Sequence, residues 1–445
     1  MKQNLIIENT NNGRDLPSHV DPIEQDFQRI KSSIHQQLVE AFDLSSLRNV
    51  DDDELWNQVR TLAHRSRVTT KETFDQLDRQ RLLQELMAEL YGLGPLEPLM
   101  QDPTVSDILV NDPYTVYIER NGCLELTDVM FADDAHLIRI IQRVVARMGR
   151  RIDEVSPMVD ARLPDGSRVN AVIPPLALDG PALSIRRFGT NPLTIDDLVA
   201  NGSILPDMVT FLSAAIKART GCIISGGTGA GKTTMLNALS AFIPHSERLV
   251  TIEDSAELIL QHPHRVRMET RPANTEGTGE IAQRDLVRNS LRMRPDRIIV
   301  GEVRGAEVWD MLQAMNTGHE GSLTTIHANS AHDALARVEM MVAMTGFDLP
   351  IAVVRQYIAS GIKLIIHVAR LQGGRRRVMQ ISEIVEVKDG NYRIEDIFGF
   401  RQCDVGEDGT VRGEFYATGY MPACLERAEA AGAHLLKDLF VKRNL

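Results

Sequence analysis

Residues 226–233 read Gly226-Gly227-Thr228-Gly229-Ala230-Gly231-Lys232-Thr233, and this stretch decides the fold of the second half of the chain. It fits the pattern G-x-x-x-x-G-K-[ST], in which glycines let backbone N–H groups point inward at an anionic phosphate. Lys232 supplies a positive charge for the β and γ phosphates, and the Thr233 hydroxyl is a ligand for Mg²⁺. With Thr234 beside it, the stretch predicts a site for a nucleoside triphosphate such as ATP.

The segments on either side of this loop have the character of a strand and a helix. Residues 221–225 (Gly-Cys-Ile-Ile-Ser) form a short apolar run, and residues 235–242 (Met-Leu-Asn-Ala-Leu-Ser-Ala-Phe) have a helical pattern. The loop then lies at a helix N-terminus, where the helix dipole favours anions. The alternative is an accidental glycine turn, and these flanking segments argue against it.

From about residue 195 onward, short apolar strands alternate with helical segments. The clearest strands are 249–252, 297–300, 323–326 and 364–368. Apolar runs without polar alternation are typical of a parallel sheet that is buried on both faces. The second half of the chain is therefore predicted to be an α/β domain with a mostly parallel sheet. Its tail is predicted to be helical from Pro422 to Phe440.

The first half of the chain divides into segments of different character. Apolar residues at three- and four-residue spacing (Phe27, Ile30, Ile34, and later Leu82 and Leu86) predict helices that could dock onto a partner. Short strand-like runs follow, with an amphipathic helix expected over 136–148. The predicted domains are a disordered N-terminus (1–20), an N-terminal helical bundle (21–92), a smaller α/β domain (93–188), a linker (189–194) and the main α/β domain with a C-terminal extension (195–445).

Composition and charge restrict the class of protein. The chain of 445 residues has 61 acidic and 49 basic residues and a net charge of −12, which does not suit a protein whose main partner is nucleic acid. Its four cysteines form no C-x-x-C pair and no zinc spacing, which indicates a reducing compartment. No apolar run approaches the ~20 residues of a membrane span. We expect a cytoplasmic protein that reaches a membrane only through partners.

Glu302 follows an apolar strand (Ile298-Ile299-Val300-Gly301-Glu302). Ligands bind outside the carboxyl ends of parallel strands, so Glu302 is expected to face the γ-phosphate and to activate or orient the attacking water. The alternative is a solvated carboxylate at a strand end.

Two further strand ends carry groups that suit phosphate chemistry. Glu253 and Asp254 end the strand at 251–252, and Glu253 is expected to hold metal-bound water, although Asp254 is also a helix N-cap candidate. His327 ends the strand at 323–326, and His319 precedes it. A histidine at this position can donate to a phosphate and sense whether it is present. The alternative for both is a satisfied structural histidine.

Arginines cluster in two places. Arginine suits the spread charge of a transferring phosphoryl group, because its guanidinium is planar and always charged. For any single arginine, surface ion pairing is the simpler interpretation, but one or two acting across a subunit interface are expected. The clusters are Arg284, Arg288, Arg292, Arg294 and Arg304 in the second half, and Arg162, Arg168, Arg186 and Arg187 in the first.

Together these motifs resemble the secretion and pilus-assembly ATPases, the motors of type II secretion, type IV pili and type IV secretion. Residues 253–258 (Glu-Asp-Ser-Ala-Glu-Leu) resemble the aspartate box of that family, and residues 300–305 (Val-Gly-Glu-Val-Arg-Gly) resemble its atypical Walker B motif. Residues 317–319 and 325–330 resemble its histidine box. The motifs stand in the family's order, and the resemblance covers nearly the whole chain beyond residue 20.

Within the family, three segments resemble the CpaF/TadA branch that drives tight-adherence (Flp) pili. They are residues 92–99, 157–170 and 184–188. General-secretion relatives typically carry a zinc-binding cysteine module, which this sequence lacks.

The resemblance implies a homo-hexamer of two-domain subunits with a RecA-like P-loop domain at the C-terminal end. ATP and Mg²⁺ would lie between the two domains, with Arg168 and Arg186 of the first domain reaching the phosphates. Glu253 and Glu302 would contact the metal through water. The motor would act at the inner face of the cytoplasmic membrane, where it would transmit a domain rotation to an inner-membrane platform protein.

Three alternatives remain open from the sequence. The first is a conjugative or effector-export motor of type IV secretion. The second is a motor that translocates nucleic acid, which the acidic composition disfavours. The third is a scaffold that binds ATP without hydrolysing it, which Glu302 and the two histidines disfavour.

Overall fold

The computed structural model describes residues 79–445 except 121, 188–191, 272, 274–277, 407–410, 431 and 434–436, together with positions 27, 30, 31, 34, 56, 57, 59 and 61. The chain divides into two compact units, Met1–Phe188 and Gly189–Leu445. Each unit is described by itself. The predicted disordered segment 1–20 and half of the predicted linker (189–191) lie outside the described residues, as does most of the predicted helical bundle.

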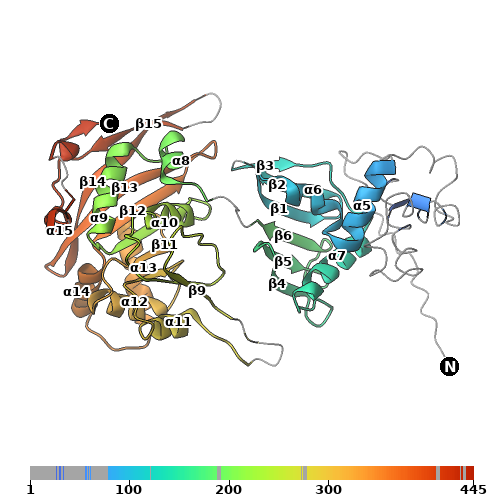
Figure 1. Ribbon diagram of the computed structural model, residues 1–445, viewed down its shortest axis with the longest axis horizontal. Helices are drawn as coiled ribbons and strands as arrows, with labels where there is room; N and C mark the ends of the chain where they lie inside the picture. Colours follow the sequence, from blue (N-terminus) through green and yellow to red (C-terminus); the bar gives the residue numbers. More distant parts are fainter. Residues whose placement is uncertain are drawn as a thin grey trace. The chain divides into compact units, whose positions relative to one another are not determined.

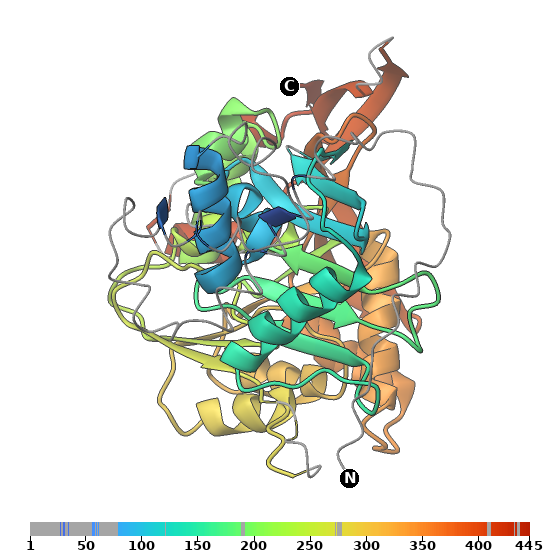
Figure 2. The same cartoon turned by 90° about the vertical axis from the view of Figure 1, so that its right-hand side faces the viewer.

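The first unit is built on a six-stranded antiparallel sheet with the strand order β3-β2-β1-β6-β5-β4 (Figure 1). In Figure 2, helices α5 (blue) and α7 (teal) lie in front of its strands and cover one face. The strands are β1 (Val105–Asp112), β2 (Thr115–Arg120), β3 (Cys123–Leu126), β4 (Met158–Arg162), β5 (Arg168–Val172) and β6 (Ala182–Arg186). The helices are α5 (Arg79–Tyr91), α6 (Glu97–Gln101), α7 (Asp134–Arg147) and the short 3-10 helix η1 (Gly94–Leu96).

Helix α7 shows how the sequence forms the first unit. Asp133 caps its N-terminus by accepting from the His136 backbone N–H at 2.7 Å. Leu137, Ile140 and Val144 recur at three- and four-residue spacing, and all three are buried against the sheet. The predicted amphipathic helix is therefore confirmed. The stripe positions Phe27, Ile30 and Ile34 are also helical and buried.

The second unit contains a ten-stranded sheet with the order β16-β15-β14-β13-β12-β7-β11-β10-β8-β9. Its strands are β7 (Cys222–Gly226), β8 (Leu249–Glu253), β9 (Arg265–Glu269), β10 (Arg297–Val300), β11 (Leu323–His327), β12 (Leu364–Arg370), β13 (Arg376–Lys388), β14 (Asn391–Val405), β15 (Val411–Ala417) and β16 (Arg443–Asn444). Its helices are α8 (Ile195–Ala200), α9 (Pro206–Lys217), α10 (Lys232–Ser240), α11 (Gln283–Ser290), α12 (Glu307–Asn316), α13 (Ala331–Ala343), α14 (Ile351–Gly361), α15 (Leu425–Ala430) and the 3-10 helix η2 (Lys437–Phe440).

The large sheet is mixed, which corrects the expectation of a mostly parallel sheet. Strands β12, β7, β11, β10, β8 and β9 pair in parallel. Strands β13 to β16 extend the sheet beyond β12 in antiparallel register. The tail also differs from the prediction, because the described residues after Pro422 are helical only in α15 and η2.

Helices cover both faces of the parallel strands, as their continuous apolar runs predict. Residues of α9 and α10 such as Phe211 and Leu236 pack on one face, together with Ile224 of β7. Residues of α12 and α13 such as Leu312 and Val338 pack on the other. The two apolar layers fix the strands, and so they fix the side chains at the strand ends.

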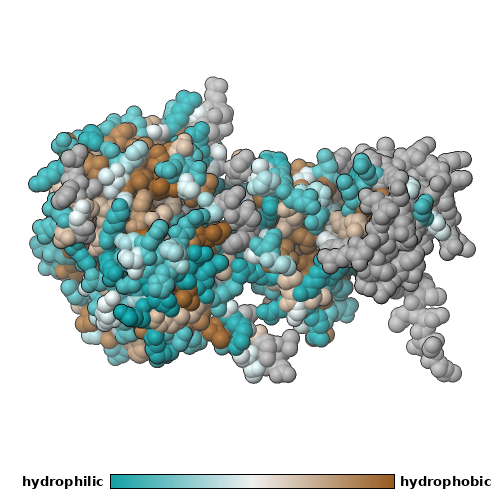
Figure 3. All heavy atoms as spheres, in the orientation of Figure 1, coloured by the Kyte–Doolittle hydropathy of each residue, from teal (hydrophilic) through white to brown (hydrophobic). Residues whose placement is uncertain are grey.

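Hydrophilic residues predominate on the visible surface of the second unit, with apolar residues scattered among them (Figure 3). Some large apolar side chains are exposed at the end of α13 and the start of α14, such as Met344, Phe347 and Ile351. Within the described part of the chain, no helix combines the length and the apolar character that crossing a membrane requires.

Candidate functional site

The phosphate loop begins at the end of β7 and leads directly into α10. Gly229 and Gly231 have φ angles of +67° and +94°, which glycine adopts without strain. Gly231 is the N-cap of α10, so the unpaired N–H groups of the first helical turn, which holds Thr233 and Thr234, point back toward the loop. The loop therefore presents a concave set of donors that fits a phosphate group.

Lys232 is the first residue of α10, and only 8% of its surface is exposed. Its Nζ donates a hydrogen bond to the Gly227 carbonyl oxygen at 3.0 Å. Burial lowers the pKa of Lys232, and the nearby Glu302 carboxylate opposes that shift. A bound phosphate would add counter-charge to this half-desolvated ammonium.

The register of the parallel strands brings the other predicted groups to the same edge of the sheet. His327 at the end of β11 pairs with Gly226 at the end of β7. β10 lies next to β11, and β8 lies next to β10, so Glu302 and Glu253 follow at neighbouring strand ends. Carboxyl ends of parallel strands share one edge, which is where ligands bind in open α/β sheets.

Glu302 is held by one strong ion pair. The Arg304 guanidinium binds its Oε2, with Nη2 at 2.7 Å and Nε at 3.0 Å, and also reaches Asp254 Oδ2 at 3.5 Å. Glu302 Oε1 lies 3.2 Å from His327 Nε2, but this buried oxygen accepts no hydrogen bond from the described residues. One carboxylate oxygen is thus engaged, and the other is available to orient or deprotonate a water.

Glu253 is almost completely buried, with 2% exposure. Its Oε1 accepts hydrogen bonds from the backbone N–H groups of Glu257 at 2.8 Å and Leu258 at 2.7 Å. No described group donates to its Oε2, which is also buried. Burial raises the pKa of Glu253, and the two backbone donors oppose the shift. An unpartnered buried oxygen at this edge fits a role in holding a metal-bound water.

His327 lies between the loop and Glu302. Burial lowers the pKa of His327, Lys232 lowers it further, and Glu302 acts in the opposite direction. The imidazole is therefore neutral at pH 7, with one N–H donor and one acceptor. A neutral histidine can donate a hydrogen bond to a phosphate oxygen. It can also contact Glu302 without forming a full ion pair with that carboxylate.

His319 lies at the opposite edge of the sheet. It precedes β11, whereas His327 ends that five-residue strand, which is about 17 Å long at ~3.3 Å per residue. Its Nδ1 lies 2.9 Å from the Pro295 carbonyl oxygen, near the start of β10. Contrary to the expectation from the sequence, this chain does not bring His319 together with the phosphate loop.

Arg168 and Arg186 lie in the first unit, on neighbouring strands β5 and β6. They are register partners, and Arg186 is in turn the partner of Asp107 on β1. Arg162 pairs with Arg168 from β4, so three arginines stand in one row on one face of the sheet. Arg186 Nε donates to Asp107 Oδ1 at 3.0 Å. Like charges in direct cross-strand contact are destabilising, and the Asp107 carboxylate offsets part of this repulsion at Arg186.

Most arginines of the other predicted cluster make ordinary surface contacts. Arg284 Nε pairs with Asp310 at 2.7 Å, and Arg288 lies 3.8 Å from the same carboxylate. Arg292 donates to the Asn289 side chain at 3.2 Å. Of this cluster, Arg304 is the member that the structure brings to the phosphate edge.

Sequence reasoning missed two arginines beside the phosphate loop. Arg376 Nε donates to the Gly229 carbonyl oxygen at 2.8 Å. A Cβ placed on Gly229 would lie 3.5 Å from Arg370 Nη1. Both come from the hairpin that joins β12 to β13. The available signal was the density of arginines around its Gly373-Gly374 turn.

The residues at this edge fit Mg²⁺ bound together with a nucleotide. Thr233 offers a hydroxyl, and Glu253 and Glu302 each offer a buried oxygen that accepts no hydrogen bond in the described structure. The described residues contain no group of three or more metal-binding side chains. In nucleotide sites, Mg²⁺ typically binds one or two protein groups, the phosphates and water.

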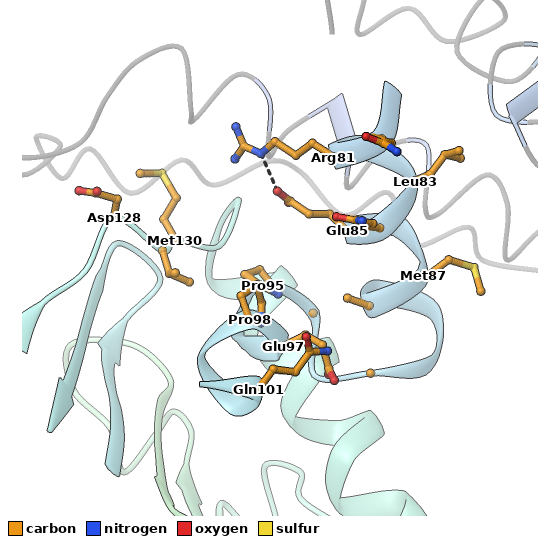
Figure 4. Close-up of a pocket in the computed structure, with 16 residues that line it drawn as sticks. Arg81, Leu83, Glu85, Met87, Pro95, Glu97, Pro98, Gln101, Asp128 and Met130 are labelled. Atoms are coloured by element: carbon orange, nitrogen blue, oxygen red, sulfur yellow. Dashed lines mark hydrogen bonds and ion pairs between the residues drawn. The ribbon is translucent and has the colours of Figure 1, made fainter. Parts of the chain in front are cut away.

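A separate pocket of about 1090 Å³ lies in the first unit, between α5 and α6 (Figure 4). Three of its charged side chains have partners nearby: Arg81 Nε binds Glu85 Oε1 at 2.8 Å, and Glu97 accepts from the Leu93 backbone N–H at 2.9 Å. None of the predicted site residues lines it. Its composition indicates no chemistry.

Several known proteins are similar to this chain in sequence. A Mycobacterium tuberculosis protein whose name refers to conjugal transfer (Rv3659c) is 42% identical over 306 residues, which cover 67% of this chain and 86% of that protein. The type IV secretion system protein VirB11 of Brucella suis is 31% identical and covers 62% of this chain, with 84% of its own length matched.

Two solved structures are also similar to this chain. The crystal structure of the Brucella suis VirB11 ATPase with sulphate is 28% identical, with a TM-score of 0.36 over 66% of this chain and 97% of that one. The pilus retraction motor PilT with bound ADP is 21% identical, with a TM-score of 0.48 over 66% of this chain and 83% of that one.

The family described as type II/IV secretion system protein matches residues 89–411, which include part of the first unit and most of the second. On this match and on the identity to its relatives, the chain belongs to the type II/IV secretion system protein family.

Proposed function

We propose that this protein is a Mg²⁺-dependent ATPase that powers a secretion or pilus-assembly machine. The observation that carries the proposal is the meeting of the phosphate loop, Glu302 and His327 at one edge of the large sheet. Each group has a distinct part in phosphoryl transfer to water, and membership of the family supports the same activity.

The catalytic roles follow from the contacts. Lys232 and the loop N–H groups hold the β and γ phosphates, and Thr233 ligates the metal. When bound, Mg²⁺ neutralises charge on the phosphates. Glu302 Oε1 orients or deprotonates the attacking water while Arg304 keeps Oε2 engaged. His327 senses the γ-phosphate, and Glu253 supports the water around the metal. His319 serves structure in this proposal.

The active unit in this proposal is a homo-hexamer with a RecA-like second domain. The support is the row of arginines in the first unit, whose crowding of positive charge suits a phosphate. Arg168 and Arg186 are the proposed phosphate contacts. The domain limits are proposed as 93–188 and 195–445, joined by a linker at 189–194.

The proposed machine is a tight-adherence type IV pilus of the CpaF/TadA branch, with the motor at the cytoplasmic face of the inner membrane. Residues 92–99, 157–170 and 184–188 support the branch. The motor would act on an inner-membrane platform protein and would bind no nucleic acid, in keeping with a net charge of −12.

A second candidate is the traffic ATPase of a conjugative or effector-exporting type IV secretion system. Relatives with such names favour it, including the conjugal transfer protein TrbB of Rhizobium radiobacter, which is 33% identical over 300 residues. The two candidates share the chemistry of the site and differ in the membrane partner.

The activity is tested by phosphate release from ATP by the purified full chain. Release that requires Mg²⁺ and stops with a chelator is the expected result. Binding of ATP without release would leave only a nucleotide-gated scaffold, and strong stimulation by DNA or RNA would revive a nucleic-acid motor. Affinity capture from its own cells then separates the two machines: a pilus platform protein supports the first candidate, and a mating-channel component supports the second.

A further inference from the structure

The hairpin between β12 and β13 forms one flank of the phosphate loop. β12 lies beside β7 in parallel register, with Val368 paired to Gly226. The hairpin that follows runs from Arg370 to Arg376, where β13 begins. Its arginines belong to no motif noted in the sequence.

Two side chains of this hairpin meet the glycines of the loop. Arg376 Nε donates to the Gly229 carbonyl oxygen at 2.8 Å, and its Cδ would lie 3.4 Å from a Cβ on Gly231. Arg370 Nη1 would lie 3.5 Å from a Cβ on Gly229. A guanidinium therefore stands beside the exposed tip of the loop, where Gly229 itself is exposed.

The position of the β12–β13 hairpin in the sheet indicates which end of a bound nucleotide it would face. Glu302 and His327, which address the γ-phosphate, follow β10 and β11 on one side of β7. The hairpin follows β12 on the other side of β7. A triphosphate that passes the N-terminus of α10 with its γ end toward β10 and β11 directs its nucleoside end toward the hairpin.

We propose that Arg370 binds the nucleoside end of the nucleotide, at the α-phosphate and ribose, and that Arg376 is a positioning residue that holds the loop. The inference rests on the proposed function, because it names a further binding residue of the same site. Arginine suits this task, since its planar fork donates two hydrogen bonds to phosphate or ribose oxygens.

The neighbouring arginines of the hairpin differ in their contacts. Arg377 donates to the Gly202 carbonyl oxygen and lies over the Phe400 and Phe415 rings, with its guanidinium carbon 5.3 and 5.9 Å from their centroids. It therefore packs the core of the sheet. Arg375 is exposed and carries the same charge as Arg370, which makes Arg375→Gln a matched control for the general effect of charge.

The test compares two probes, ADP and inorganic tripolyphosphate, by titration calorimetry with the full-length protein. In Arg370→Gln, the Kd for ADP should rise about tenfold, the size expected for one charge-assisted hydrogen bond, while the Kd for tripolyphosphate stays within about twofold. The KM for ATP should rise more than kcat falls. Arg376→Gln should weaken both probes, because the loop itself loses a support.

Several outcomes would overturn the inference. An unchanged Kd for ADP in Arg370→Gln would exclude the contact, and an equal loss for both probes would reduce Arg370 to a support of the loop. An equal effect in Arg375→Gln would show a diffuse charge effect instead of a binding residue. If the wild-type chain binds neither probe, the proposed function itself fails, which is a separate result.

Discussion

The two edges of the parallel strands in the large sheet differ in how completely their buried charged side chains are hydrogen-bonded. At the amino-terminal edge, Arg297 is completely buried and all its nitrogens are paired. Its Nε and Nη2 bind Glu247, and its Nη1 donates to the carbonyl oxygens of Ile216 and Gly321. At the carboxyl-terminal edge, Glu253 Oε2 and Glu302 Oε1 are buried and accept no hydrogen bond from the described residues.

An unpaired buried polar atom costs about 1–3 kcal/mol, so its persistence needs a reason. The amino-terminal edge gains stability from the complete pairing of the Arg297 guanidinium. The carboxyl-terminal edge lacks such pairing at these two oxygens, and in the proposed function a bound nucleotide and its metal would supply their partners. The same sheet thus separates a supporting edge from a reactive one.

The largest effect is expected for loss of the loop cation. Lys232→Ala removes the charge that faces the β and γ phosphates, so ATP turnover should fall about a thousandfold or more with the fold intact. Glu302→Ala should abolish turnover as well, while ATP still binds. Phosphate release and circular dichroism check both variants. Turnover near the wild-type rate in either would remove that residue from the reactive edge.

The next effect is expected at the supporting edge. Arg297→Met leaves the buried Glu247 carboxylate with Arg219 as its remaining cation among the described residues, at 3.3 Å from Nε, so the free energy of unfolding should fall by about 3 kcal/mol. Urea denaturation measures this loss. Arg219→Gln is the control, because this half-exposed partner should cost less than about 1 kcal/mol. Equal losses in the two variants would contradict the contrast between them.

A third effect compares the two histidines directly. His327→Ala should slow turnover about a hundredfold, because a donor to the γ-phosphate is lost. His319→Ala should change turnover less than about threefold and lower the free energy of unfolding by about 1 kcal/mol, through its contact with the Pro295 carbonyl. Steady-state kinetics and urea denaturation separate the two. A large loss of turnover in His319→Ala would mean that the supporting edge also holds a catalytic group, and it would contradict the contrast between the two edges.

The smallest effect concerns pH. His367 Nδ1 lies 3.0 Å from the Ser225 hydroxyl beside the phosphate loop, and burial lowers the pKa of His367 below its ordinary value of 6.5. His367 is therefore protonated near pH 6.5 in the unfolded chain but stays neutral to lower pH in the folded chain. The free energy of unfolding should decline as pH falls below 6.5. His367→Gln should lose part of this decline, at most about 1 kcal/mol between pH 7 and 5.5. Identical pH profiles of unfolding would contradict the shift.

The local pattern of the sequence was enough to predict the reactive edge. The strand–loop–helix order around Gly226–Thr233 is determined by residues that are neighbours in the chain, and so are the carboxylates at two strand ends. Sequence motifs can therefore predict both. The position of His319 could not be predicted in this way. His319 and His327 lie at opposite ends of one strand, and the sequence does not show which end of that strand faces the phosphate loop. Only the direction of β11 in the sheet separates His319 from His327.

The antiparallel extension and the arginine hairpin were not predicted, for a related reason. β13 mixes charged and apolar residues in the run Arg376–Lys388, which lacks the continuous apolar character of the parallel strands. The contact of Arg376 with Gly229 joins residues 147 positions apart, and no spacing rule covers that distance. The pairing of distant strands depends on the fold as a whole, and local sequence patterns do not predict it.

The first glycine of the phosphate loop has a consequence for how such sequences are read across evolution. A Cβ at Gly226 would lie 2.4 Å from the Val368 carbonyl oxygen, so the packing of two strands excludes every other residue there. Selection for a stable fold alone would conserve this glycine. A descendant that had lost its ligand would still keep it, and only the fate of Lys232 and Glu302 would reveal the loss.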